Sequence, residues 1–72
     1  MAGAVHTRES DGAWVNEVDG EGEASRHDTR SDAASFGRDL ARERGVEHVV
    51  HGEDGSVEER YDYGDGPLPN AG

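Results

Sequence analysis

Short apolar runs separated by glycine-rich turns mark the first third of the chain as strand-forming. Residues 5–8 and 13–18 are β-prone and flank an Asp-Gly turn, which is a strong signal for a β-hairpin. A second acidic turn at residues 19–22 leads to a brief extended piece at residues 24–27. The pattern therefore predicts a hairpin followed by a third short strand.

The central segment has the spacing of an amphipathic helix. Small and apolar residues recur three, four and seven positions apart, which places them on one helical face. This face comprises Ala33, Phe36, Gly37, Leu40, Ala41 and Arg44. Thr29 is the expected N-cap, with Asp32 at the third helical position, and Gly45 is the expected stop. We predict a helix that ends at about Arg44.

A second hairpin is predicted after the helix. Residues 46–51 are valine-rich, residues 52–55 form another Asp-Gly turn, and residues 56–61 return as a strand. The resulting order, β-β-(β)-α-β-β, predicts an α+β fold in which one helix packs on one face of a small antiparallel sheet made of two hairpins. We expect a single domain over residues 1–61 and a Gly/Pro-rich tail over residues 62–72.

The apolar inventory is small for a chain of 72 residues. Hydrophobic residues make up 31%, but eight are alanines, and only 13 sizeable apolar side chains remain apart from Met1: seven Val, two Leu and four aromatic residues. A core of this size is marginal for independent stability, which favours self-association. With no cysteine, no disulfide or thiolate metal site supports the fold.

The charge balance allows two interpretations. Seventeen acidic residues against seven arginines, with no lysine, give a net charge of −10. Low hydrophobicity with high net charge is typical of disorder. It also suits a folded protein of a salt-rich cytoplasm, because molar salt shortens the Debye length to about 3 Å and screens carboxylate repulsion. The segment patterns favour the second interpretation, a halophilic protein.

The order of the motifs resembles an uncharacterised prokaryotic family, domain of unknown function 2188. The resemblance rests on His27-Asp28-Thr29, the following helix, residues 49–52 and 63–65, and the two prolines, with Trp14 also fitting the pattern. The resemblance covers about residues 6–69. Within the family, the sequence resembles a haloarchaeal-type member. Asn16 and His48 stand where the family pattern has apolar residues. The resemblance implies a folded domain and no particular activity.

Four histidines raise the question of metal binding. His48 and His51 are three apart on one predicted strand and so point to opposite faces. His6 with His27 or His51 could meet across neighbouring strands. No metal-binding spacing motif is present, and we favour His51 and His27 as hydrogen-bond partners of turn backbone. No dedicated metal and no cofactor is expected.

The sequence predicts no enzyme. No serine lies in a Gly-x-Ser-x-Gly elbow, and a domain this small offers little volume for a pocket. No apolar run reaches the length of a membrane span and no signal peptide is recognised, so a soluble cytoplasmic protein without membrane association is expected.

Association is the function that these features favour. We expect a small non-catalytic protein that acts through a homodimer or another protein partner, with Trp14, Val49 and Tyr61 as interface candidates. A nucleic-acid-associated regulator is the alternative, with Arg30, Arg38 and Arg42 as contacts, although interleaved acidic residues favour ion pairs along the helix and make nucleic acid a less favoured partner. A weak His/carboxylate metal binder is a further alternative.

Overall fold

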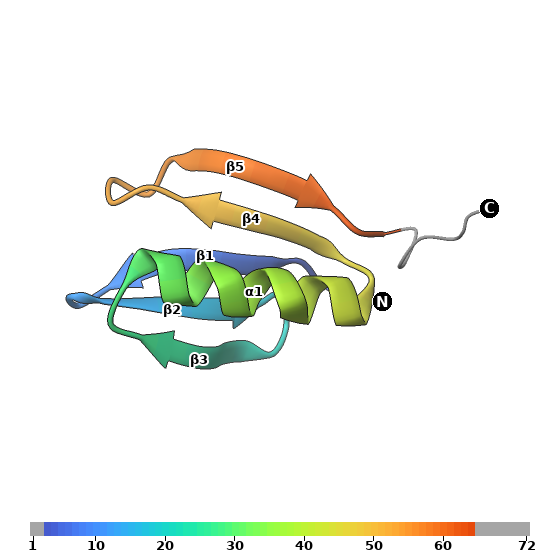
Figure 1. The fold of residues 1–72 in the computed structure, drawn as a ribbon, viewed down its shortest axis with the longest axis horizontal. Coiled ribbons are helices and arrows are strands. Elements are labelled where there is room, and N and C mark those ends of the chain that lie inside the picture. The colour runs from blue at the N-terminus through green and yellow to red at the C-terminus, as the bar shows by residue number, and fades with distance from the viewer. Residues whose placement is uncertain (1–2, 65–72) are drawn as a thin grey trace.

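The computed structural model describes residues 3–64 as five strands and one helix (Figure 1). In chain order these are β1 (Val5–Ser10), β2 (Ala13–Val18), β3 (Gly22–His27), α1 (Arg30–Arg44), β4 (Glu47–His51) and β5 (Val57–Asp62). The predicted α+β class is confirmed, and so is the order of elements. Most of the predicted tail, from residue 65 onward, lies outside the described residues.

The sheet has the strand order β3-β2-β1-β4-β5 and is mixed rather than wholly antiparallel. The two central strands, β1 and β4, pair in parallel, with Val5 opposite His48 and Thr7 opposite Val50. Both predicted antiparallel hairpins are present, as β1–β2 and β4–β5, and the prediction of a wholly antiparallel sheet is corrected because the two hairpins join through a parallel pair. Parallel neighbours need a long crossover, and α1 supplies it by carrying the chain from the β3 edge back across one face (Figure 1).

Local signals set the turn and the helix ends. Asp11 and Gly12 both have positive φ, 54° and 84°, as a type I′ hairpin turn requires, and this tight turn lets β1 continue to Ser10. The Thr29 hydroxyl accepts a hydrogen bond from the Asp32 amide at 3.1 Å. Gly45 ends α1 in the left-handed conformation, with φ 67°. Both predicted helix caps are confirmed.

The buried stripe of α1 is narrower than the predicted apolar face. Ala33, Gly37 and Ala41 are buried, whereas Phe36 is 46% exposed. The small residues bring the helix close to the sheet, and Phe36 lies at the rim of that contact. Its ring is 5.3 Å from the ring of His27, centroid to centroid.

Among the described residues, every buried apolar side chain is a valine or an alanine, and the partly buried Leu40 and Tyr63 pack against this core. Its buried members are Val5, Val15, Val18, Ala33, Ala41, Val46, Val49 and Val50. Three polar side chains are as deeply buried, namely Thr7, Asn16 and His48, and His48 is the largest fully buried side chain among the described residues. The centre of the interface between sheet and helix is therefore polar.

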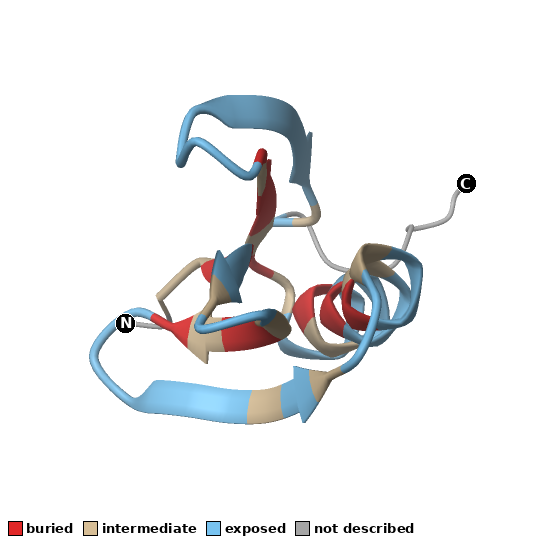
Figure 2. Ribbon diagram, turned by 90° about the vertical axis from the view of Figure 1, so that its left-hand side faces the viewer, coloured by how far each residue is buried: buried red, intermediate tan, exposed pale blue. Residues whose placement is uncertain are grey.

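The helix leaves one strand uncovered. Among the described residues, the backbone of α1 packs on β1 to β4 and does not approach that of β5, although an ion pair between the side chains of Arg30 and Glu58 joins the two elements. All six residues of β5 are exposed, as Figure 2 shows. No helix within residues 3–64 is long and apolar enough to cross a membrane.

Candidate functional site

A chain of side-chain hydrogen bonds crosses the sheet beneath α1. It joins one residue each from β4 and β1, one from β2, and two from β3. In order, these are His48, Thr7, Asn16, Ser25 and His27, with successive separations of 2.8, 2.5, 3.0 and 3.0 Å. The chain links the buried centre of the domain to the half-buried imidazole of His27 on β3.

One backbone carbonyl fixes the direction of the hydrogen bonds that join Asn16, Thr7 and His48. The amide nitrogen of Asn16 donates to the Ala33 carbonyl at 2.9 Å, and a carbonyl can only accept. The amide oxygen of Asn16 therefore faces Thr7 and accepts the Thr7 hydroxyl proton. Because the single hydroxyl proton of Thr7 is already donated to Asn16, Nε2 of His48 donates a hydrogen bond to the Thr7 oxygen. At the other end, the Ser25 hydroxyl oxygen accepts from Asn16 and lies within hydrogen-bond distance of Nε2 of His27.

Gly37 makes room for this chain. A Cβ at position 37 would lie 2.7 Å from the Thr7 hydroxyl and 2.8 Å from Nε2 of His48, and closer still to the amide oxygen of Asn16. No side chain fits there, so the backbone of α1 packs directly on the polar centre. The glycine is a requirement of packing rather than of backbone conformation.

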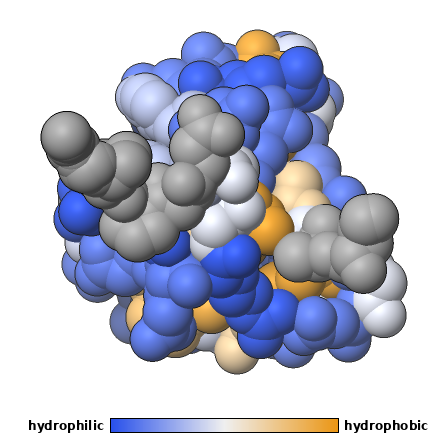
Figure 3. Space-filling model, turned by 90° about the vertical axis from the view of Figure 1, so that its right-hand side faces the viewer, coloured by the Kyte–Doolittle hydropathy of each residue, from blue (hydrophilic) through white to orange (hydrophobic). Residues whose placement is uncertain are grey.

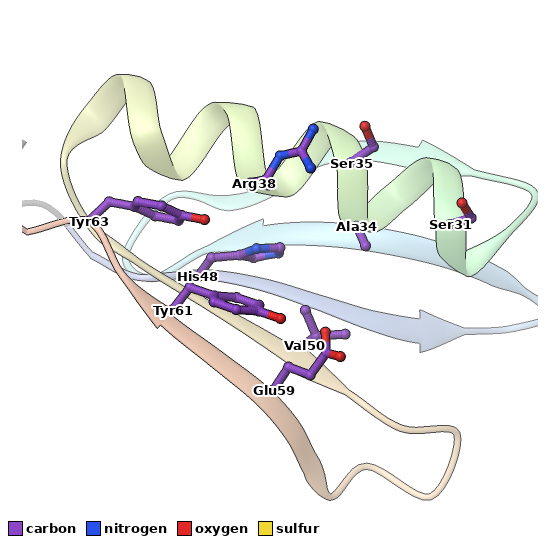
Figure 4. Close-up of a pocket in the computed structure, with 9 residues that line it drawn as sticks. All are labelled: Ser31, Ala34, Ser35, Arg38, His48, Val50, Glu59, Tyr61 and Tyr63. Atoms are coloured by element: carbon purple, nitrogen blue, oxygen red, sulfur yellow. The ribbon is translucent and has the colours of Figure 1, made fainter. Parts of the chain in front are cut away.

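A groove opens beside this centre, between α1 and the uncovered β5. Its volume is about 540 Å³. The helix contributes Ser31, Ala34, Ser35 and Arg38, β4 contributes His48 and Val50, and the last strand and its end contribute Glu59, Tyr61 and Tyr63 (Figure 4). Tyr61 is 46% exposed on the sheet wall, with its ring centroid 6.4 Å from that of His48.

The imidazole of His48, which lines the groove, is neutral. Burial lowers the pKa of His48 below its ordinary value, and the positive charge of Arg38 acts in the same direction. The neutral ring carries its proton on Nε2, so Nδ1 is a lone-pair acceptor. That atom is buried and has no hydrogen-bond partner among the described residues. The groove thus combines aromatic rings, hydroxyl groups, one guanidinium and one carboxylate, a mixture suited to a polypeptide partner.

The chain matches a family model over residues 5–63, that of an uncharacterized protein conserved in bacteria, DUF2188. The chain belongs to this family. The match ends at Tyr63, so the two prolines that entered the predicted resemblance lie beyond it. No curated protein and no solved structure matches the chain.

The two departures from the family pattern meet in the structure of this DUF2188 member. Asn16 and His48, expected at apolar positions, are both buried and are joined through Thr7. Two polar residues at strand positions expected to be apolar were the sequence feature from which the hydrogen-bond chain could have been predicted. The groove itself was not predicted, because it depends on how far α1 extends across the sheet.

The predicted interface residues occupy different environments. Tyr61 lies in the groove, as described. Trp14 lines a second hollow of about 580 Å³ near the start of α1, where the guanidinium of Arg30 is 6.0 Å from its ring centroid. Val49 is 1% exposed and belongs to the core. The prediction of Val49 as an interface residue is therefore corrected.

The predicted nucleic-acid contacts are the arginines of α1. Arg30 forms an ion pair with Glu58 at 2.5 Å, and Arg38 lies 3.5 Å from Asp39. Arg42 is exposed in the last helical turn. Across the described residues, six of the seven arginines lie within ion-pair distance of a carboxylate. The prediction of ion pairs along the helix holds for Arg38 and Asp39, whereas Arg30 and Arg44 pair with Glu58 and Glu21 outside α1, which corrects the prediction for these two arginines.

The histidines partly follow prediction. His48 faces the helix and His51 lies on the other face of the sheet, where Nδ1 of His51 donates to the Gly55 carbonyl of the turn at 3.1 Å. His27 bonds to Ser25 instead of turn backbone, which corrects the prediction for that residue. His6 and His51 meet across β1 and β4. Within residues 3–64, no group of three or more His, Asp or Glu side chains is arranged to hold a metal ion.

Proposed function

We propose that this protein is a small, non-catalytic interaction protein of a salt-rich cytoplasm, and that it acts by pairing with a second copy of itself along β5. The observation that carries the proposal is the exposure of β5. It is an edge strand whose outer backbone groups have no strand partner in the described chain, and α1 does not cover it. An exposed edge of this kind pairs readily with another strand.

The distribution of exposed apolar side chains favours β5 over the other sheet edge. Val57 and Tyr61, at 51% and 46% exposed, both lie on β5, whereas no large apolar side chain lies on β3. Elsewhere the surface is predominantly hydrophilic, as the face in Figure 3 illustrates. Burial of Tyr61 beside the groove of a partner would extend a core that holds only valine and alanine.

Two further features support association over the other functions considered. The ion-paired arginines leave little uncompensated positive charge on α1 for nucleic acid, which requires a basic surface. The hydrogen-bonded serine–histidine pair, Ser25 and His27, has no carboxylate that orients the imidazole among the described residues, and neither residue lines the groove.

Sedimentation equilibrium in molar and millimolar potassium chloride, with a chelator present, tests the proposal. Two copies of charge −10 repel, so self-association strengthens as salt screens them, whereas a basic protein partner would bind more weakly. Tyr61→Ser should weaken the dimer at least tenfold. Phe36→Ser is the matched control, because Phe36 is equally exposed on the far side of α1. A compact monomer at every protein concentration in molar salt contradicts the proposal.

A further inference from the structure

The face of the sheet opposite α1 carries a pair of imidazoles in unusual proximity. His6 on β1 and His51 on β4 stack with ring centroids 5.2 Å apart, and Nδ1 of His6 lies 3.0 Å from Nε2 of His51. Both side chains are partly accessible to solvent. The pair is remote from the groove, because His6 and His51 face away from the helix.

The outer nitrogen of each ring is already committed as a donor. Nε2 of His6 lies 3.1 Å from a carboxylate oxygen of Asp19, and Nδ1 of His51 lies 3.1 Å from the Gly55 carbonyl. An ionised carboxylate and a carbonyl only accept hydrogen bonds, so each outer nitrogen holds a proton. In neutral rings, the two inner nitrogens would then both present lone pairs to each other. Two lone pairs that face each other at 3.0 Å form a pair of donor atoms that one cation can bridge.

We propose that His6 and His51 form a two-imidazole binding site for a divalent transition-metal cation such as Zn²⁺. Two imidazole nitrogens on one tetrahedral zinc, at bond lengths of about 2.0–2.1 Å, are about 3.3–3.4 Å apart, so the rings need to separate by only about 0.3–0.4 Å.

The surroundings match those of metal-bound histidines. A metal-ligating imidazole typically donates its other N–H to a carboxylate or a backbone carbonyl, and here Asp19 and Gly55 supply one of each. The nearby Glu17 is held by Arg8 through two hydrogen bonds of 3.0 and 2.9 Å, which leaves the imidazoles as the ligands. Water would complete the coordination from the open side. The net charge of −10 favours a bound cation.

Zinc titration of the whole chain tests this site. Calorimetry should show saturable binding of one zinc per chain. Nitrogen-15 imidazole spectra should show shifts at His6 and His51 and none at His27 or His48. The spectra use the unaltered protein, so this readout holds even where a variant fails to fold.

Variants locate the ligands. His6→Gln and His51→Gln should each weaken zinc binding at least tenfold, and Asp19→Ala should weaken it about tenfold by freeing the His6 ring. His27→Gln is the matched control, because it removes an imidazole from the other face, and it should leave binding unchanged. The proposal is overturned if the His6 and His51 resonances do not move in millimolar zinc, or if His27→Gln removes the binding.

Discussion

The Thr7 hydroxyl donates a hydrogen bond to the amide oxygen of Asn16 across β1 and β2, at 2.5 Å, and neither side chain is accessible to solvent. Thr7 also accepts from His48, so it is the link between the two polar residues that replace apolar ones in the strands. In a core of valine and alanine, this link determines whether the buried polar groups stabilise or destabilise the domain.

Thr7→Val should lower the free energy of unfolding by about 1–3 kcal/mol. Valine has the shape of threonine but leaves the Asn16 oxygen and the His48 N–H buried without a partner. Urea denaturation measures the change. Thr7→Ser keeps the hydroxyl and loses one methyl group, so it should cost only about 0.8 kcal/mol. Equal losses in the two variants would show that the hydroxyl contributes nothing.

Gly37→Ala should destabilise the protein, although the same change in an ordinary helix interior stabilises by about 1 kcal/mol. The added Cβ would overlap Thr7, Asn16 and His48, so α1 has to move away from the sheet. We expect a net loss of about 1–3 kcal/mol in thermal or urea unfolding. A stabilised variant would contradict the close contact between Gly37 and the hydrogen-bond chain.

The stability of the fold should depend on pH through His48. Burial lowers the pKa of His48 in the folded state below the unfolded value of about 6.5. As pH falls below about 6.5, His48 becomes protonated in the unfolded chain but stays neutral in the folded one. The free energy of unfolding therefore decreases by up to about 1.4 kcal/mol per pH unit, until the pH reaches the lower pKa of His48 in the folded state. Above about 6.5 the ring is neutral in both states and its contribution is constant.

Comparison with His48→Gln isolates this effect, because glutamine can still donate to Thr7 but does not titrate. We expect the free energy of unfolding of the natural chain to fall more steeply than that of the variant between neutral and mildly acidic pH. Other titrating groups are common to both proteins and cancel in the difference. Parallel pH profiles would mean that the folded and unfolded pKa values of His48 are the same.

Salt should stabilise the monomeric fold as well as its association. The 17 acidic residues outnumber the arginines, and at millimolar salt their repulsion extends over tens of ångströms. We expect the free energy of unfolding to rise from millimolar to molar potassium chloride, measured by urea titration at a protein concentration below dimer formation. A circular dichroism spectrum and an unfolding midpoint that do not change with salt would contradict this prediction.

The elements that depend on near neighbours were predictable from residue patterns. The Asp11-Gly12 turn, the Thr29 cap and the Gly45 stop each require a few adjacent residues in a particular conformation, and all three are confirmed. The separation of His48 and His51 onto opposite faces follows from strand alternation alone and is also confirmed. Phe36 was misplaced because helical spacing indicates a face without giving its buried width.

The residue pattern by itself determined the class, the order of the elements and the turns, because these arise from local conformational preferences and from the alternation of polar and apolar positions. Tertiary structure alone decided how the two hairpins pair with each other. The parallel alignment of β1 with β4 brings His48 to Thr7 and His51 to His6, partners 41 and 45 residues apart along the chain. The same arrangement leaves the backbone of β5 outside the part of the sheet that α1 covers and so opens the groove. Polar residues in a strand indicate that partners are needed, but only the packing of distant segments selects them.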